Sequence, residues 1–373
     1  MDIRDSDVYM VGSMAVPSDT VEEAMGIAAE HLGQRLFAMP DGEVGTHRQM
    51  WAPGVGAQVF RNHPDVVLVD EASGFPSVET PLGLLGASRI RPGVEEFSLE
   101  GHLPYADAAI AGYQHLREMR ERGEVPRGLR FQVALPTAFE IVSPWFGDRD
   151  EWPAMYRAYW RAIEAELGRI QEAIPPGELL LQWDFATEMS DIIAAATGRR
   201  ELQTKLGLTW LPVLSAEETL EAHTALDTIE AMSRGVSDEV TFGYHLCLGT
   251  AISFPTTPAD DLEWVVRVAN TLVERTPHRV DFLHLPVMAD SGGPFFAPLA
   301  DLEVGDARVF LGLGHADGVE GILARGRAAR EFLPAFGISN YCGYGRQEAD
   351  HIHDLLSDLA EGADRLAAER DAR

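Results

Sequence analysis

The chain has 373 residues, a length that suits two average domains or one large α/β barrel. Its formal net charge of −29 repels nucleic acids and anionic membranes, so neither is an expected partner. No apolar run reaches the roughly 20 residues needed to cross a bilayer. The first residues carry no signal-peptide pattern, and only two cysteines occur, so we expect a protein of the reducing cytoplasm.

Short apolar runs alternate with longer amphipathic stretches along the chain. Eight runs are expected to be strands: Val8–Met14, Arg35–Met39, Leu129–Leu135, Leu179–Asp184, Val240–Cys247, Val280–Val287, Arg308–His315 and Phe336–Cys342. Helices are expected over Thr20–Leu32, Ala106–Arg122, Glu151–Ala173, Ser215–Ser233, Asp260–Glu274, Gly318–Phe332 and Gln347–Leu366. Alternating strands and helices form parallel βαβ units, and eight of them predict the α/β fold called a (β/α)₈ TIM barrel.

The region from residue 40 to residue 128 fits this alternation least well. It is rich in Pro, Gly and His and contains one clear helical pattern. We expect an elaborated insertion after the second strand that forms a lid over the barrel mouth, where insertions usually carry function. No linker or internal repeat is evident, so residues 1–373 are expected to form one domain.

The two cysteines lie at the ends of predicted strands, in His245-Leu246-Cys247 and in Tyr341-Cys342-Gly343. Residues two apart in a strand point to the same face, so His245 and Cys247 can converge on one ion. Thiolate and imidazole ligands suit Zn²⁺, and a catalytic zinc site has about three protein ligands and an open position. Each cysteine could instead be a small buried hydrophobe. A disulfide is another alternative, but it leaves the nearby His245 unexplained.

Polar residues follow most of the predicted strands, at the end where a TIM barrel has its active site. Each one alone has a commoner explanation, because an Asp after a strand is often a helix cap and a lone His is often structural. Their joint occurrence at one rim predicts a functional site. The residues are Gly12-Ser13, Asp41-Gly42-Glu43, Pro136-Thr137, Gln182-Trp183-Asp184, His245, Cys247, His284, His315 and Cys342.

In their order along the chain, these motifs resemble the catalytic barrel of cobalamin-independent methionine synthase. The family's G-S, G-E and H-x-C motifs are similar to Gly12-Ser13, Gly42-Glu43 and His245-Leu246-Cys247. Its Q-x-D-E-P-A is similar to Gln182-Trp183-Asp184-Phe185-Ala186, and its D-C-G followed shortly by Arg is similar to Tyr341-Cys342-Gly343-Tyr344-Gly345-Arg346. The resemblance implies a TIM barrel with bound zinc and a glutamate, Glu43, that helps to hold the substrate. It also implies that His315 matches a late-strand histidine proposed as a proton donor.

The chain departs from this family in three respects. There is no room for the family's N-terminal half, so the resemblance is to a short, single-barrel relative. The glutamate zinc ligand on the strand after H-x-C is missing, and His284 is the only good ligand in the corresponding run. The E-P after the aspartate has become Phe185-Ala186. The predicted zinc ligands are therefore His245, Cys247 and Cys342, with His284 as a candidate fourth.

These observations predict a zinc-dependent enzyme that transfers a methyl or alkyl group to a small thiol, with His315 and Glu43 as catalytic residues. An alternative is a zinc-dependent lyase or hydrolase that acts on an oxygenated small molecule, for example an aromatic one. A third is a non-enzymatic binding or assembly partner in which zinc only adds stability, and a homodimer is one assembly open to the chain. The residues predicted to bind the substrate are Ser13, Glu43, Thr137, Trp145, Trp183 and Asp184.

Overall fold

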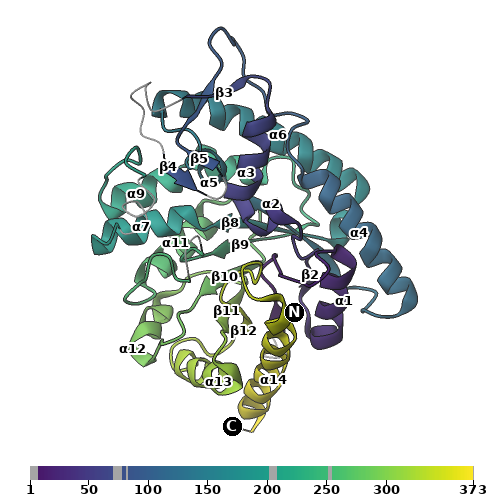
Figure 1. Cartoon of the computed structure of the whole chain (residues 1–373). Coiled ribbons are helices and arrows are strands. Elements are labelled where there is room, and N and C mark those ends of the chain that lie inside the picture. Colours follow the sequence, from purple (N-terminus) through teal and green to yellow (C-terminus); the bar gives the residue numbers. More distant parts are fainter. Residues whose placement is uncertain (1–6, 70–77, 81–82, 201–207, 251–253, 373) are drawn as a thin grey trace.

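The computed structural model describes residues 7–69, 78–80, 83–200, 208–250 and 254–372 (Figure 1). Eight parallel strands pair in the order β1-β12-β11-β10-β9-β8-β7-β2. An isolated parallel bridge joins Val8 to Leu36, and Phe37 N donates to the Val8 carbonyl at 2.8 Å. Because this bridge links the two outer strands of that order, the sheet closes into the predicted (β/α)₈ barrel. The strands are β1 (Val8–Tyr9), β2 (Ala38–Met39), β7 (Arg130–Pro136), β8 (Leu179–Phe185), β9 (Thr241–Leu246), β10 (Phe282–Pro286), β11 (Arg308–Gly314) and β12 (Gly337–Asn340).

Helices connect the strands and surround the barrel (Figure 1). Two predicted helix starts are confirmed by their caps: the Thr20 hydroxyl accepts from Glu23 N, and Ser215 and Glu218 form a reciprocal capping box. The longer helices are α1 (Val21–Leu32), α3 (Trp51–Asn62), α4 (Tyr105–Arg122), α6 (Trp152–Ala173), α7 (Thr187–Thr197), α9 (Ala216–His223), α10 (Leu226–Ser233), α11 (Glu263–Arg275), α13 (Gly318–Ala329) and α14 (Ile352–Asp371). Three short ones are α2 (Thr46–Gln49), α5 (Ala138–Val142) and α12 (Gly293–Phe296).

The single helix predicted over residues 215–233 is wrong, because the chain turns at Thr224 between α9 and α10. The Thr224 hydroxyl donates to the Leu220 carbonyl at 2.8 Å. Its own carbonyl accepts from Arg275 Nη1 at 2.9 Å. An arginine of α11 thus occupies the acceptor that a continuing helix would use, a contact that helical periodicity cannot reveal.

The region between residues 40 and 128 contains more regular structure than predicted. Two small antiparallel pairs, β3 (Val66–Leu68) with β6 (Ser88–Ile90) and β4 (Val78–Thr80) with β5 (Gly83–Leu85), follow α2 and α3. The last helix of the region, α4, packs on β7 and α6 in the manner of an ordinary barrel helix. The part before α4 is therefore the elaboration, and its action as a lid stays a prediction.

Aromatic rings fill the amino-terminal end of the barrel. The ring of Tyr9 lies 5.1 Å from that of Phe282 and 5.2 Å from that of Phe310. Above them, Gln132 Nε2 donates to the Gln182 side chain at 3.1 Å, so the interior becomes polar towards the carboxyl ends of the strands. The space for a site is therefore at the carboxyl end.

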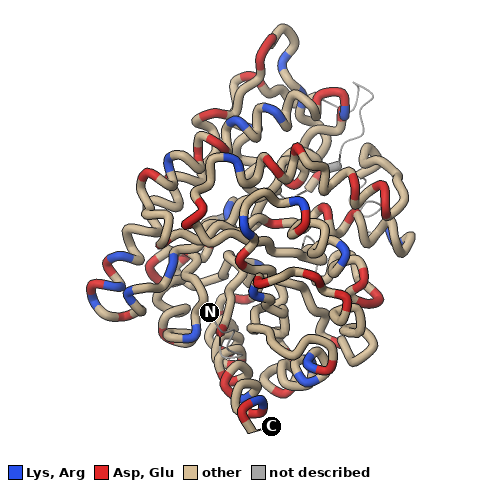
Figure 2. The backbone as a smooth tube through the Cα atoms, turned by 180° about the vertical axis from the view of Figure 1, so that it is seen from behind, with Lys and Arg blue, Asp and Glu red and all other residues tan. Residues whose placement is uncertain are grey.

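The surface charges are mixed rather than segregated. Figure 2 shows acidic and basic positions interspersed over the back of the molecule, without a separate basic face. Within the described part of the chain, no helix is both long and apolar enough to cross a membrane.

Candidate metal centre and substrate cavity

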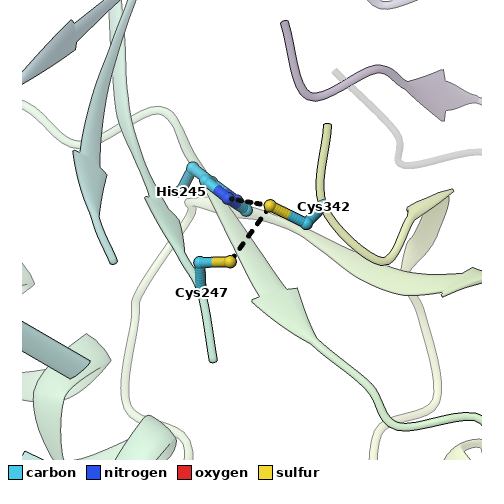
Figure 3. Close-up of side chains that lie close together, drawn as sticks. All are labelled: His245, Cys247 and Cys342. Atoms are coloured by element: carbon cyan, nitrogen blue, oxygen red, sulfur yellow. Dashed lines mark hydrogen bonds between the residues drawn. The ribbon is translucent and has the colours of Figure 1, made fainter. Parts of the chain in front are cut away.

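Three potential metal ligands converge at the carboxyl end of the barrel (Figure 3). His245 lies in β9, Cys247 follows that strand, and Cys342 follows β12. Cys342 Sγ lies 3.1 Å from Cys247 Sγ and 3.6 Å from His245 Nε2. Ligand atoms around tetrahedral zinc are about 3.5 to 3.8 Å apart, so an ion would fit after the two sulfurs move apart by roughly half an ångström.

The hydrogen bond between the two cysteines favours a protonated Cys247 and a deprotonated Cys342. Cys247 Sγ donates to Cys342 Sγ, and this hydrogen bond holds the pKa of Cys342 well below its usual range. Burial raises the pKa of Cys247, although the Gly249 amide donates to its sulfur at 3.3 Å. A thiolate at Cys342 next to an imidazole is a soft donor set of the type that zinc prefers.

His284, the predicted fourth ligand, lies behind His245 and not beside the sulfurs. Its Nδ1 is 2.7 Å from His245 Nδ1, and its Nε2 is 2.9 Å from the Asn340 carbonyl. A carbonyl can only accept, so His284 Nε2 carries a proton and its Nδ1 accepts from His245 Nδ1. His245 Nε2 is then left unprotonated and directed at the cysteines. In this arrangement His284 would select the tautomer of a candidate ligand, and three protein ligands would leave one coordination position open.

Burial lowers the pKa of His284 well below its ordinary value, which keeps it neutral as this chain of hydrogen bonds requires. Gly312 of β11 makes the connection to Asn340 possible, since a Cβ there would lie 3.2 Å from His284 Nε2 and 3.2 Å from the Asn340 carbonyl oxygen.

We expect His284→Phe to weaken zinc binding by about 10- to 100-fold, because His245 would lose the acceptor that sets its tautomer. Competition with a chromophoric chelator measures this affinity. His278→Phe is the matched control, since His278 is also buried but bonds to the Arg279 and Ser237 carbonyls at the other end of β10. An unchanged zinc affinity in His284→Phe would contradict the orienting role.

The two cysteines of the candidate metal centre line a cavity of about 90 Å³. Six of the predicted site residues come together on its wall: Ser13, Glu43, Gln182, Asp184, Cys247 and Cys342. The main residues on the wall that the prediction missed are Trp51, Glu140, Thr187, Ser190 and Arg346. Glu140 had a sequence signal, because Thr137-x-x-Glu140 directly after a strand is a helix-start pattern, and Thr137 does cap α5.

Three predicted substrate contacts do not reach this cavity. Trp183 points out of the barrel, where its indole donates to the Met232 carbonyl at 3.0 Å and its ring lies 5.7 Å from that of Trp160. Trp145 packs against Gly56 of α3. Thr137 is buried and donates to Glu188, so it positions α5 and does not line the cavity. The outward direction of Trp183 follows from the alternation of side chains along a strand, because its neighbours Gln182 and Asp184 both point inward.

Glu43 is held on the cavity wall by an unusual backbone. Its φ is +45° and that of Gly42 is +79°, and the wall residue Trp51 has φ +57°. Left-handed backbone at non-glycine residues is strained and often marks functional sites. The Glu43 carboxylate lies against Gly12, where a Cβ would come within 2.2 Å of Oε1. Burial raises the pKa of Glu43 to about 8, against the opposing effect of Arg48.

Two further buried carboxyls face the cavity with Glu43. Burial raises the pKa of Glu140 to about 7, and the nearby Trp51 indole opposes this rise. Among the described residues, however, neither Glu140 Oε2 nor Trp51 Nε1 completes a hydrogen bond. Burial, with the charges of Glu140 and Glu43, also raises the pKa of Asp184, which accepts a bond from Gln182.

His315 lies on a neighbouring hollow and is neutral near pH 7. Its Nε2 donates to the Val287 carbonyl at 2.8 Å, and its ring stacks on Tyr341 at 4.8 Å. Burial and the charge of Arg325 lower its pKa to about 4. Its predicted role as a proton donor stays a prediction, and this environment does not favour the imidazolium form that such a role uses.

We expect Glu140→Gln to raise the melting temperature, by about 3 to 6 °C at pH 8 and by less at pH 5.5. The folded-state pKa is raised from 4.5 to about 7, so the carboxyl costs stability as pH rises through this interval, and glutamine removes the cost. Thermal unfolding at both pH values, at constant metal content, measures the effect. Glu164→Gln on the exposed face of α6 is the control. A gain equal at both pH values would be inconsistent with a buried, protonated Glu140.

Comparison with known proteins places this site on a recognised fold. No protein-family model matches the chain, and no curated protein matches it in sequence. Among solved structures, it is similar to a B12-independent methionine synthase from Shewanella sp. W3-18-1 in complex with selenomethionine, with a TM-score of 0.62, 14% identity and 100% of both chains covered. A Listeria monocytogenes structure described as a vitamin-B12-independent methionine synthase gives a TM-score of 0.55 at 16% identity, with 96% of both chains covered. At these identities the likeness shows that this chain has the barrel fold of those proteins over its full length.

Proposed function

We propose that this protein is a zinc-dependent enzyme that transfers a methyl or alkyl group to a small thiol. The observation that carries the proposal is the convergence of His245, Cys247 and Cys342 on one point at the edge of a buried cavity. A purely structural zinc site is usually closed by four protein ligands. Here His284, the residue best placed to be the fourth, is engaged with His245 and Asn340 instead.

The donor set fits zinc, and zinc bound there would supply a Lewis acid that lowers the pKa of a substrate thiol. In the proposed reaction the thiolate sulfur attacks the donor's methyl or alkyl carbon. The new C–S bond forms while the bond to the leaving group breaks, and the electron pair departs with the leaving group, which then takes a proton. The role of this chain is to hold the two substrates in line and to supply that proton.

Glu43 is the better placed proton donor of the two predicted catalytic residues. Its raised pKa leaves the carboxyl protonated at neutral pH, and it lies on the same cavity wall as Cys342. His315 is neutral and its Nε2 proton is already given to a carbonyl. His315 would then position the second substrate through the ring cluster that it forms with Tyr341 and Phe254.

A second hollow next to the cavity supports transfer between two substrates. It measures about 520 Å³ and shares Thr250, Gly343 and Arg346 with the cavity that contains the cysteines. The rings of Phe254, His315 and Tyr341 form part of its wall. A lyase or a hydrolase that acts on one small molecule needs no second binding space. A transferase does, because it must bind a group donor beside the acceptor. This difference favours transfer over the lyase and hydrolase alternatives.

We expect saturating small thiol to raise the number of sulfur neighbours from two to three in zinc-edge X-ray absorption of the zinc-loaded protein. The reason is that zinc held by His245, Cys247 and Cys342 would have three protein ligands, which would leave one position for a substrate thiol. The zinc-loaded protein without thiol provides the baseline, and Cys342→Ser should begin with one sulfur neighbour. A lyase or hydrolase would instead add an oxygen neighbour from its substrate or an analogue. A spectrum that thiol leaves unchanged would refute the transferase proposal.

A further inference from the structure

A second group of potential metal ligands lies on the surface, apart from the cavity that Cys247 and Cys342 line. It consists of Glu30 and His31 of α1 and His353 of α14, whose ligand atoms all lie within 4.8 Å of one another. The first helix of the barrel and its last helix pack against each other (Figure 1). Both therefore contribute ligands to the same place.

The two histidines of this group already face each other. His31 Nε2 lies 2.8 Å from His353 Nδ1, and the two rings meet edge to face with their centroids 5.0 Å apart. Two nitrogen ligands of one tetrahedral zinc ion are about 3.3 Å apart, because each Zn–N bond is about 2.0 to 2.1 Å long. An ion would therefore fit between the rings after they separate by roughly half an ångström. Both side chains are partly or fully exposed, so small rotations can provide this space.

A neighbouring hydroxyl holds His31 in the orientation of a ligand. His31 Nδ1 lies 2.9 Å from the Oγ of Ser357, which is one turn further along α14 than His353. When Nε2 binds an ion, Nδ1 carries the proton, and the hydroxyl can accept it. Metal-bound histidines usually have such a partner at the second nitrogen, because it fixes the tautomer and the direction of the ring. Ser357 thus provides this support before any ion binds.

The charge around the two histidines also suits a metal ion. Burial and the neighbouring His353 lower the pKa of His31, so its imidazole is neutral near pH 7 and can bind a metal. The carboxylates of Glu30 and Asp354 lie close enough to oppose this decrease. The chain has a formal net charge of −29, which attracts cations to its surface. Two imidazoles and one carboxylate suit Zn²⁺, Co²⁺ or Ni²⁺ better than Mg²⁺ or Ca²⁺.

The group lies at the seam where the two ends of the barrel meet. Strand β1, which precedes α1, has only two residues and is joined to the segment before β2 by an isolated bridge. Arg35 and Asp364 already form an ion pair across this seam. His31 and His353 are 322 residues apart along the chain. An ion that joins them closes a long loop, and this removes more conformational freedom from the unfolded chain than a local link does.

We propose that Glu30, His31 and His353 form a second metal site, which binds a divalent transition-metal ion such as Zn²⁺ and fastens the first helix of the barrel to the last. The site is independent of the proposed transferase, because it shares no ligand with the cysteine centre. Its ion stabilises the closed barrel and takes no part in the reaction.

Calorimetric titration of the full-length protein with Zn²⁺ tests the site. We expect two binding events per chain, one at the cysteine centre and one at the two histidines. His31→Gln and His353→Gln should each weaken the histidine event by about tenfold or more, because each removes one of three ligands. The cysteine event should stay within about twofold in both variants, since the two sites are separate. Cys342→Ser should show the reverse pattern.

His351→Gln is the matched control for these variants. His351 is also exposed and lies two residues before His353, but it belongs to neither group of potential ligands. Both binding events should be unchanged in this control.

Thermal unfolding measures whether the ion fastens the two helices. With the cysteine centre already occupied, free Zn²⁺ at about 100 times the dissociation constant of the second site should raise the melting temperature by about 3 to 5 °C. The reason is that only the folded chain brings the two histidines together. The rise should be absent in His353→Gln and retained in His351→Gln. Binding without any rise would overturn the fastening role.

The titration also separates this site from the zinc centre of the proposed function. A single event that Cys342→Ser abolishes would overturn the histidine site. A second event that persists in both histidine variants would mean an adventitious ion only, and it would overturn the site as well. A single event that disappears in His31→Gln would support the histidine site and would count against zinc at the cysteines.

Discussion

The geometry of the candidate metal centre depends on one hydrogen bond inside the barrel, from His284 Nε2 of β10 to the Asn340 carbonyl at the end of β12. This bond reaches across β11, the strand between them. It fixes the proton on His284 Nε2, and the contact between the two histidines then leaves His245 Nε2 free to bind an ion. The same bond connects β10 to the end of β12, two residues before Cys342. Ligand orientation and strand placement are therefore set by a single interaction, which Gly312 leaves room for.

The cavity lined by Cys247 and Cys342 includes features that lower the stability of the fold. Glu43 and Trp51 have left-handed backbone, and three buried carboxyls face one another without a cationic partner among the described residues. Nothing in the folding of a barrel requires either feature, since apolar residues at these positions would pack with less cost. Backbone strain and buried carboxyls without ion-pair partners at one place are features that binding sites commonly combine, because a ligand can relieve both.

The sequence-based errors have specific physical causes. Trp183 was assigned to the pocket with Asp184, although adjacent residues of a strand point to opposite faces, so periodicity alone could have excluded it. The break at Thr224 depends on Arg275, which is 51 residues away along the chain. His284 was predicted as a candidate fourth zinc ligand, but both of its ring nitrogens meet His245 and Asn340 instead, and the spacing of residues does not contain that information.

The sequence by itself determined the eight strands, their alternation with helices and the rim on which the ligands lie, because short apolar runs and a period of two residues are local properties. It also determined that His245 and Cys247 share a face. Only the tertiary structure decided that Cys342 reaches them, that His284 stands behind them, and that Glu140 joins Glu43 and Asp184 on one wall. These facts depend on the closure of the barrel, which brings side chains from different strand ends within a few ångströms, and on burial, which sets their charge.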